Sequence, residues 1–351
     1  MSLTDFRTLG RSGLVVSPLA LGTMTFGTPR WGSPDEVSQA IFNAYVDAGG
    51  NFLDTADVYA GGQSEELVGR FVAERHLRDQ LVLATKFTFN ASGGNPNAGG
   101  NGRKNMYRAV EDSLRRLKTD YIDLYWLHAW DVVTPVEEVL QTFGDLVRAG
   151  KIRYFGLSDV PAWYVTQLVT LAQAHGVPGP IAIQPEYSLV ERSIEREHVP
   201  AAHALGLGIV PWSPLAGGFL AGKYERVGAG SKTSGQGRLS GANPFGDSKF
   251  TEQNWRVLEA LRGVAAQLDR PLAQVALAWA AAQPGISALL LGASQVAQLS
   301  GNLAALDLRL TPAQLRQLDE ASALEIVHPY QISSPAVNRS IFGGHSVRGW
   351  R

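Results

Sequence analysis

The stretch NFLDTADVYAGGQSEELVGRFVAERHLRDQLVLATK, residues 51–86, decides the fold. A short β-rich run at 51–54 precedes an amphipathic segment that predicts a helix over 64–75, with Ser64 in the place of its cap. A second apolar run, 81–86, predicts another strand. A strand, a crossover helix and a further strand form the repeating unit of a parallel sheet, so the stretch indicates an α/β protein.

The same alternation continues along the chain. Strands are predicted at 19–22, 51–54, 81–86, 122–128, 152–158, 181–186, 208–212 and 288–291. Helices are predicted at 41–48, 64–75, 104–117, 139–150, 162–175, 197–205, 251–268, 271–282 and 296–303. About eight strand-then-helix units favour a closed (β/α)8 TIM barrel over an open sheet. No Gly-x-Gly-x-x-Gly fingerprint follows a predicted strand, which also argues against the open dinucleotide-binding sheet.

Segments outside this alternation complete the predicted architecture. The runs 7–9 and 14–16 predict an N-terminal β-hairpin that would plug one end of the barrel. Long polar, glycine-rich loops follow strands 3 and 7, at 89–103 and 228–246, and are either ordinary surface loops or mobile lids. We expect one domain over 1–351. Its C-terminal tail, 323–351, would fold over the pocket or pack against a neighbouring subunit.

The bulk composition excludes several classes of function. Hydrophobic residues make up 45% and charged residues 18% of the chain, and the net charge is −1, so neither disorder nor nucleic-acid binding is indicated. The absence of cysteine removes disulfides and thiolate chemistry and fits a reducing compartment. No apolar run is long enough to span a membrane. We therefore expect a soluble, cytoplasmic protein with no membrane or nucleic-acid partner and no metal site.

Four polar residues, Asp54, Tyr59, Lys86 and His128, lie at or just beyond the ends of predicted strands. In a barrel of this type the carboxyl ends of the strands form the active site. Lys86 would act as a cation, Asp54 as its counter-ion, and Tyr59 as a weak acid whose pKa of about 10 falls beside a cation. Taken singly, these residues are also explained as a helix cap, a rim aromatic, a solvated lysine and a strand-end histidine. Together they suit the reduction of a carbonyl group.

These four residues belong to motifs that resemble the aldo-keto reductase superfamily. The motifs occur in the family's order at 21–24 (LGTM), 51–59 (NFLDTADVY), 83–86 (LATK), 120–128 (DYIDLYWLH), 150–158 (GKIRYFGLS) and 212–218 (WSPLAGG). The resemblance implies hydride transfer from C4 of NADPH to a small-molecule carbonyl substrate, with Tyr59 as general acid. It also implies that His128 orients or polarises the carbonyl.

The resemblance further implies two sets of binding residues. Near the nicotinamide, cofactor contacts are expected from Gly22, Thr23, Met24 and Asp54, with Ser158, Asp159 and Gln184 at the carboxamide and Trp212 stacked on the ring. Contacts along the pyrophosphate are expected from Ser213, Pro214, Leu215, Gly217, Leu220, Gly222 and Lys223. Contacts at the adenosine end are expected from Gly292, Ser294, Gln298 and Asn302. Substrate contacts are expected from Tyr59, His128, Trp31, Phe87 and Trp130, which would favour aromatic or medium-chain apolar carbonyls.

The chain departs from the common family pattern in three places. Asp159 stands where asparagine is frequent, and a carboxylate accepts hydrogen bonds but cannot donate one to the carboxamide oxygen. Trp212 stands where tyrosine is common. The stretch 292–302 contains no Lys or Arg to hold a 2′-phosphate, so that charge would come from Arg238 or Lys232. If neither supplies it, NADH would compete with NADPH.

Two other classes of function remain open at this point. The first is a cofactor-sensing regulatory subunit with slow turnover, similar to the potassium-channel β subunits that resemble this family; it predicts a stable homo-oligomer. The second is a lyase that forms a Schiff base on Lys86, because such lysines also lie at barrel strand ends. Asp54 and Tyr59 are better explained by carbonyl reduction, and an oxidoreductase is the favoured interpretation.

Overall fold

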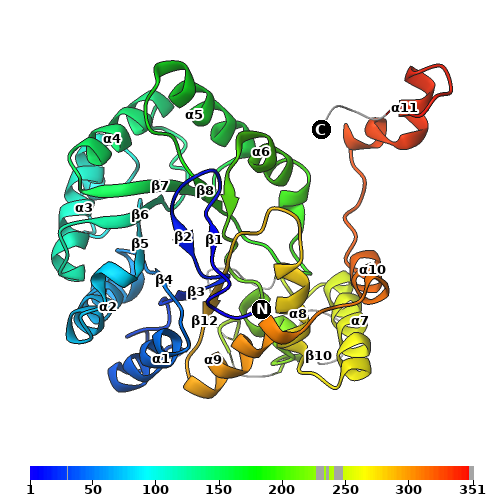
Figure 1. Ribbon diagram of the computed structural model, residues 1–351, viewed down its shortest axis with the longest axis horizontal. Coiled ribbons are helices and arrows are strands. Elements are labelled where there is room, and N and C mark those ends of the chain that lie inside the picture. Colours follow the sequence, from blue (N-terminus) through cyan, green and yellow to red (C-terminus); the bar gives the residue numbers. More distant parts are fainter. Residues whose placement is uncertain (30, 227–232, 235–236, 241–247, 348–351) are drawn as a thin grey trace.

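A computed structural model describes residues 1–29, 31–226, 233–234, 237–240 and 248–347. Its centre is an eight-stranded parallel sheet in the order β12-β3-β4-β5-β6-β7-β8-β9 (Figure 1). The strands are β3 (Leu19–Gly22), β4 (Phe52–Asp54), β5 (Val82–Phe87), β6 (Ile122–Leu127), β7 (Ile152–Ser158), β8 (Ala182–Gln184), β9 (Gly208–Ile209) and β12 (Leu289–Gly292). All eight were predicted from the sequence.

The sheet closes between its first and last strands. A parallel bridge joins Ile209 to Ile286. The Ser287 amide donates to the Ile209 carbonyl at 2.8 Å, and the Leu290 amide donates to the Pro211 carbonyl at 3.0 Å. These bonds connect β9 to the segment that leads into β12, which leaves the sheet without a free edge. The predicted (β/α)8 barrel is therefore confirmed.

Helices surround the barrel on its outer side (Figure 1). They are α1 (Asp35–Asp47), α2 (Gln63–Glu74), α3 (Arg103–Leu117), α4 (Val136–Arg148), α5 (Ala162–His175), α6 (His198–Leu205), α7 (Glu252–Leu268), α8 (Leu272–Ala281), α9 (Val296–Leu303) and α10 (Pro312–Ala321). A further helix, α11 (Pro335–Ile341), belongs to the C-terminal tail. Helices α10 and α11 were not predicted from the sequence. The prediction that Ser64 caps α2 is wrong, because Gly62 with φ of 98° precedes this helix, while the buried Ser64 hydroxyl bonds the Thr23 hydroxyl at 2.8 Å.

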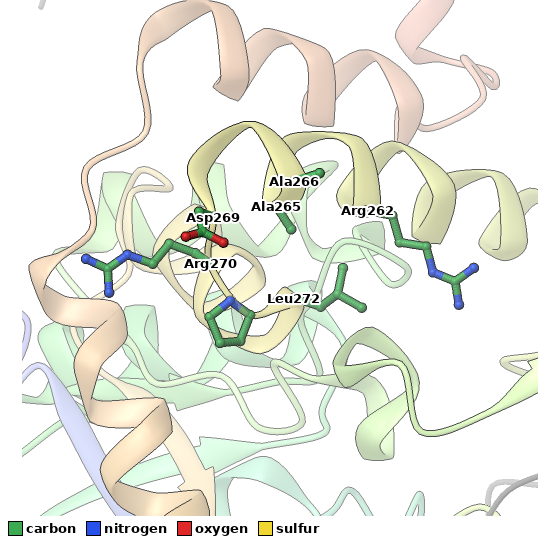
Figure 2. A pocket seen from close by; sticks show the side chains of 7 residues that line it. Arg262, Ala265, Ala266, Asp269, Arg270 and Leu272 are labelled. Atoms are coloured by element: carbon green, nitrogen blue, oxygen red, sulfur yellow. The ribbon is translucent and has the colours of Figure 1, made fainter.

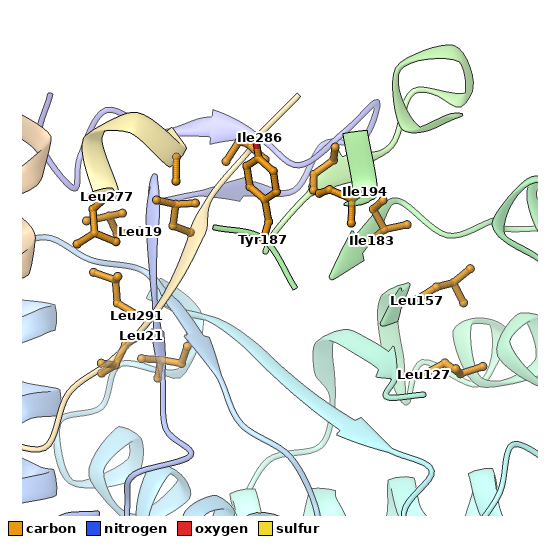
Figure 3. Close-up of a cluster of buried hydrophobic side chains, with 14 of the residues drawn as sticks. Leu19, Leu21, Leu127, Leu157, Ile183, Tyr187, Ile194, Leu277, Ile286 and Leu291 are labelled. Carbon is orange, nitrogen blue, oxygen red and sulfur yellow. The ribbon is translucent and has the colours of Figure 1, made fainter. Parts of the chain in front are cut away.

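Strand residues divide between two apolar clusters. One cluster fills the space between sheet and helices and includes Leu21, Leu127, Leu157 and Leu291 (Figure 3). The other lies inside the barrel and consists of Leu9, Val16, Ala20, Phe52, Val82, Ala84, Leu124, Trp126, Ala182, Val210 and Ala288. Alternate residues of each strand therefore face inward and outward, as the pleat requires.

The N-terminal hairpin closes one end of the barrel, as predicted. Its strands are β1 (Arg7–Thr8) and β2 (Val15–Val16), and its buried Leu9 and Val16 belong to the inner cluster. A Cβ at Gly10 would lie 2.4 Å from the Ile181 carbonyl oxygen, so only glycine fits there. Ile181 precedes β8, and the hairpin therefore covers the amino ends of the strands. Their carboxyl ends are left for a site.

The two long loops and the tail differ in how they contact the barrel. The first loop was expected to be too polar for the core, yet its Asn101 is fully buried, accepts from the Thr88 hydroxyl at 2.7 Å and donates to the Ala129 carbonyl at 3.0 Å. The second loop contains a short hairpin of β10 (Glu225–Arg226) and β11 (Thr233–Ser234). In the tail, α11 lies apart from the barrel (Figure 1).

No helix among the described residues is long and apolar enough to cross a membrane.

Candidate active site

The inward-facing positions of the strands place the site residues in one mouth. Two positions after the last inward-facing residue of each strand, the next side chain on the same face lies at the carboxyl end of the barrel. The pairs are Ala20 and Gly22, Phe52 and Asp54, Ala84 and Lys86, Trp126 and His128, Gly156 and Ser158, Ala182 and Gln184, Val210 and Trp212, and Leu290 and Gly292. A period of two along each strand thus extends the inner cluster into a ring of polar and glycine residues together with Trp212.

Lys86 and Asp54 form a buried ion pair at the base of this mouth. Lys86 is 1% and Asp54 0% exposed, and the Lys86 ammonium donates to Asp54 Oδ1 and, at 2.8 Å, to the Thr55 carbonyl. Asp54 Oδ2 accepts from Gln184 Nε2 at 2.9 Å. Desolvation opposes the charge on Lys86, but Asp54 and Tyr59 outweigh it and raise the pKa of Lys86. Lys86 is therefore held as a cation, which argues against a Schiff-base role because that role needs a neutral amine.

Tyr59 lies in the short helical turn η1 (Tyr59–Gly62) that follows β4. The Lys86 ammonium is 5.0 Å from the centroid of its ring. Burial raises the pKa of Tyr59 and outweighs the opposing effect of Lys86, so the prediction of a net fall in this pKa is wrong. The hydroxyl therefore carries its proton at neutral pH, and Lys86 limits the cost of giving that proton up.

His128 faces Tyr59 across the mouth. Their ring centroids are 5.9 Å apart in an edge-to-face arrangement, and the His128 ring also meets Phe89 edge-to-face at 4.9 Å. Desolvation and then Lys86 lower the pKa of His128 well below its usual range, so the imidazole is neutral. Its Nδ1 is buried and has no hydrogen-bond partner in the part of the chain that the structure describes. A neutral ring with an unused nitrogen suits the binding of a polar ligand group.

Phe87 does not lie with the other residues predicted to contact a substrate. It is fully buried, stacks on Tyr125 at 4.9 Å and meets Phe143 at 5.9 Å. Because Lys86 points into the barrel, its neighbour Phe87 must point outward, and its predicted substrate contact is wrong. Phe89, which is 47% exposed and contacts the His128 ring, lies at the mouth instead and was not predicted. Strand alternation counted from Lys86 would have excluded Phe87.

Arg238 contacts both Trp31 and Met24. The Arg238 guanidinium lies 5.4 Å from the Trp31 ring centroid and donates to Met24 Sδ at 3.3 Å. The charge of Arg238 acts, as a minor effect, to lower the pKa of Tyr59. Lys232, the other predicted source of charge, lies outside the described residues. Trp130 meets Trp163 edge-to-face at 5.3 Å, farther along the rim.

The residues expected at the nicotinamide are connected to the ion pair. Gly22 is in register with Asp54 on one side and Gly292 on the other. The Ser158 hydroxyl donates to the Gln184 carbonyl at 2.8 Å, while the Gln184 amide holds Asp54. The Trp212 indole donates from Nε1 to Asp159 Oδ1 at 3.0 Å. A single hydrogen-bonded group thus runs from Lys86 to the expected carboxamide contacts.

The expected pyrophosphate and adenosine contacts lie in two further segments. The first holds Ser213, Pro214, Leu215, Gly217, Leu220, Gly222 and Lys223 around the helical turn η5 (Ala216–Ala221). Within it the Gly217 amide donates to the Ser213 hydroxyl at 3.2 Å. In the second, the Ser294 amide donates to Gln298 Oε1 at 3.0 Å. Leu220 is fully buried, backbone included, so no part of it lies on the surface that a cofactor would contact.

Two observations are compatible with a dinucleotide along these segments. Asn302 Nδ2, at the far end of the second segment, is buried without a hydrogen-bond partner among the described residues. A Cβ at Gly292 would have no heavy atom closer than 4.0 Å, so open space lies beside the backbone in register with Gly22. The residues present therefore suit a nicotinamide dinucleotide, whereas 292–302 supplies no cation for a 2′-phosphate.

Two surface concavities lie away from this mouth. One is lined by residues of α7, α8 and the turn between them, including Arg262, Asp269 and Leu272 (Figure 2). The other is lined by residues of α1, α2 and the end of α3, including Asp35, Arg70 and Arg115. Neither contains Asp54, Tyr59, Lys86 or His128. They face solvent on the helical outer layer and do not belong to the candidate active site.

Comparisons with known proteins agree with this geometry. A sequence model described as the Aldo/keto reductase family matches residues 18–323. The chain is 34% identical over 327 residues to a norsolorinic acid reductase of Aspergillus flavus, covering 91% of this chain and 81% of that protein. It is 36% identical over 324 residues to a probable voltage-gated potassium channel subunit beta of Oryza sativa subsp. japonica, covering 90% and 95% respectively. It is 32% identical over 346 residues to a putative aryl-alcohol dehydrogenase of Saccharomyces cerevisiae, covering 94% and 90%. The family match spans all eight barrel strands, and the chain belongs to the aldo/keto reductase family of oxidoreductases.

Proposed function

We propose that the protein is an NADPH-dependent reductase that converts aldehydes or ketones to alcohols, with Tyr59 as general acid. The observation that carries this proposal is the buried Lys86 ammonium, paired with Asp54 and 5.0 Å from the Tyr59 ring. A protonated tyrosine beside a fixed cation is prepared to release a proton as negative charge develops on a carbonyl oxygen. The neutral His128 across the mouth adds a second polar contact.

Each protein group has a defined part in the proposed reaction. NADPH, when bound, supplies the hydride that reaches the carbonyl carbon. His128 donates an N–H to the carbonyl oxygen and orients it. Tyr59 transfers its hydroxyl proton to that oxygen, and Lys86 stabilises the resulting tyrosinate. Asp54 keeps Lys86 charged and aimed, and Gln184 holds the second Asp54 oxygen at 2.9 Å. Solvent then restores the proton of Tyr59.

Aromatic or medium-chain apolar carbonyls are the proposed substrates. Phe89, Trp31 and Trp130 lie around the mouth and offer apolar faces to such a ligand. The printed names of two relatives, an aryl-alcohol dehydrogenase and a norsolorinic acid reductase, are consistent with this class. A substrate panel in which small sugars outperform aromatic aldehydes by a wide margin would refute the assignment.

The cofactor preference follows from where the cations lie. NADPH is the family expectation, but Arg238 contacts Trp31 and Met24 near Tyr59, and the 292–302 segment has no cation. We therefore propose that NADPH is used and that NADH serves as a competing donor. The ratio of the two rates with one aldehyde measures the preference directly.

The test is a turnover assay with the purified chain, 4-nitrobenzaldehyde and each reduced cofactor, followed at 340 nm. We expect aldehyde-dependent oxidation over many turnovers. Tight cofactor binding without turnover would refute the reductase proposal. That outcome would support a regulatory subunit, which the similarity to the rice channel protein keeps as the second candidate.

A further inference from the structure

Asp159 and Trp212, two residues that depart from the common family pattern, contact each other directly. The Trp212 indole N–H donates to Asp159 Oδ1 at 3.0 Å. Asp159 follows the inward-facing Ser158 at the end of β7 and has φ of 46°, in the left-handed region. The Ser158 hydroxyl, which donates to the Gln184 carbonyl, lies 3.5 Å from Asp159 Oδ2. The carboxylate is thus held at the edge of the indole, next to the expected carboxamide contacts.

Asp159 brings a negative charge to this side of the mouth. Desolvation, with a smaller contribution from Glu186, raises the pKa of Asp159 to about 6, while the Trp212 hydrogen bond and the charge of Lys86 act in the opposite direction. The Glu186 charge is itself balanced by Lys249, whose ammonium lies 2.8 Å away. At pH 8 Asp159 is therefore ionised, and an asparagine in its place would be neutral.

We propose that Asp159 makes the protein bind the oxidised nicotinamide cofactor more tightly than the reduced one. This inference rests on the proposed function, in which Trp212 stacks on the nicotinamide ring. Loss of a hydride, which removes a proton and two electrons, changes that ring from neutral to positively charged. A carboxylate fixed at the edge of the stacking residue attracts the positive ring and is indifferent to the neutral one.

The same preference would assist carbonyl reduction. A group that stabilises the oxidised cofactor relative to the reduced one makes hydride release from the bound reduced form more favourable. Asp159 also offsets Lys86, whose positive charge at the base of the mouth disfavours a second positive charge nearby. The expected cost is slower release of the oxidised cofactor after each turnover.

The substitution Asp159→Asn tests the charge with little other change. The asparagine carbonyl can still accept from Trp212 Nε1, and asparagine tolerates the left-handed backbone of residue 159 better than most residues. Trp212→Phe is the matched control, because it removes the indole donor but keeps both the Asp159 charge and an aromatic ring. Comparing the two variants separates the effect of charge from that of ring position.

The measurement is the dissociation constant of NADP+ and of NADPH for the full chain at pH 8 and low salt, without substrate, from quenching of tryptophan fluorescence. For Asp159→Asn we expect NADP+ binding to weaken about tenfold, equivalent to about 1.4 kcal/mol, and NADPH binding to change less than about twofold. For Trp212→Phe we expect both forms to weaken by similar factors. Equal changes for the two forms in Asp159→Asn would overturn the inference. Failure of wild-type protein to bind either form would refute the proposed function, and the inference with it.

Discussion

Replacing Lys86 with methionine tests the buried ion pair in both of its roles, stability and catalysis. Lys86 and Asp54 are 1% and 0% exposed, so the substitution leaves a carboxylate buried with Gln184 as its remaining side-chain donor. Removing one partner of a buried pair typically costs about 3–5 kcal/mol, because the other charge is left without compensation. Methionine retains most of the lysine stem, so little of this cost arises from a cavity. We expect the free energy of unfolding to fall by about that amount.

The double variant Asp54→Asn with Lys86→Met separates the two roles. Replacing both charges with neutral groups of similar volume is often close to neutral for stability, so we expect the double variant to regain more than half of the lost free energy of unfolding. Its turnover should stay as low as that of Lys86→Met, reduced by about a hundredfold or more, because Lys86 no longer stabilises the Tyr59 anion. Urea denaturation and initial rates measure the two quantities. Wild-type stability in Lys86→Met, or recovered turnover in the double variant, would refute the reasoning.

Two further predictions concern residues beside the site. Burial and then Glu65 raise the pKa of Asp57 to about 7, so the stability that its proton contributes is fully present below about pH 4 and is lost as the pH rises through 7. As the pH rises from 5 to 8, the free energy of unfolding of Asp57→Asn should therefore increase by roughly 2–3 kcal/mol relative to that of wild type, at about 1.4 kcal/mol per pKa unit. Urea denaturation measures both free energies, and a difference that does not change with pH would contradict this prediction. Phe89→Ala should raise the KM for an aromatic aldehyde about fivefold, through the loss of about 1 kcal/mol of aromatic contact. Phe87→Ala should instead lower the free energy of unfolding by about 3–5 kcal/mol with little change in KM, and the opposite pattern would restore Phe87 to the pocket.

The barrel could be predicted because its signals are local. Each strand is a short apolar run and each helix has an apolar stripe, so alternation alone indicates the order of elements. The helix α10 was missed although Thr311 and Gln314 form a capping box before it, a pattern that is visible in the sequence. Asn101 was assigned to a flexible loop because asparagine is usually exposed, but three hydrogen bonds, to Thr88, Asp131 and Ala129, allow its burial.

The four central residues of the candidate site were predicted, but the direction of the Tyr59 pKa shift and the contact between Asp159 and Trp212 were not. Position in the strand and family resemblance together identified Asp54, Tyr59, Lys86 and His128. The direction of the Tyr59 pKa depends on the balance between burial and a cation 5.0 Å from its ring, and a sequence contains neither quantity. The Asp159 contact with Trp212 joins residues 53 positions apart, so no local pattern could have indicated it.

The central claim is that Tyr59 donates the proton in carbonyl reduction. Tyr59→Phe removes one hydroxyl and keeps the ring that contacts His128 and Lys86. The most direct test therefore compares kcat for 4-nitrobenzaldehyde with the dissociation constant of NADPH in wild type and in this variant. We expect kcat to fall by about a hundredfold or more, and the dissociation constant to change less than about twofold. A variant that keeps most of its turnover, or that loses cofactor binding in proportion to rate, would contradict it.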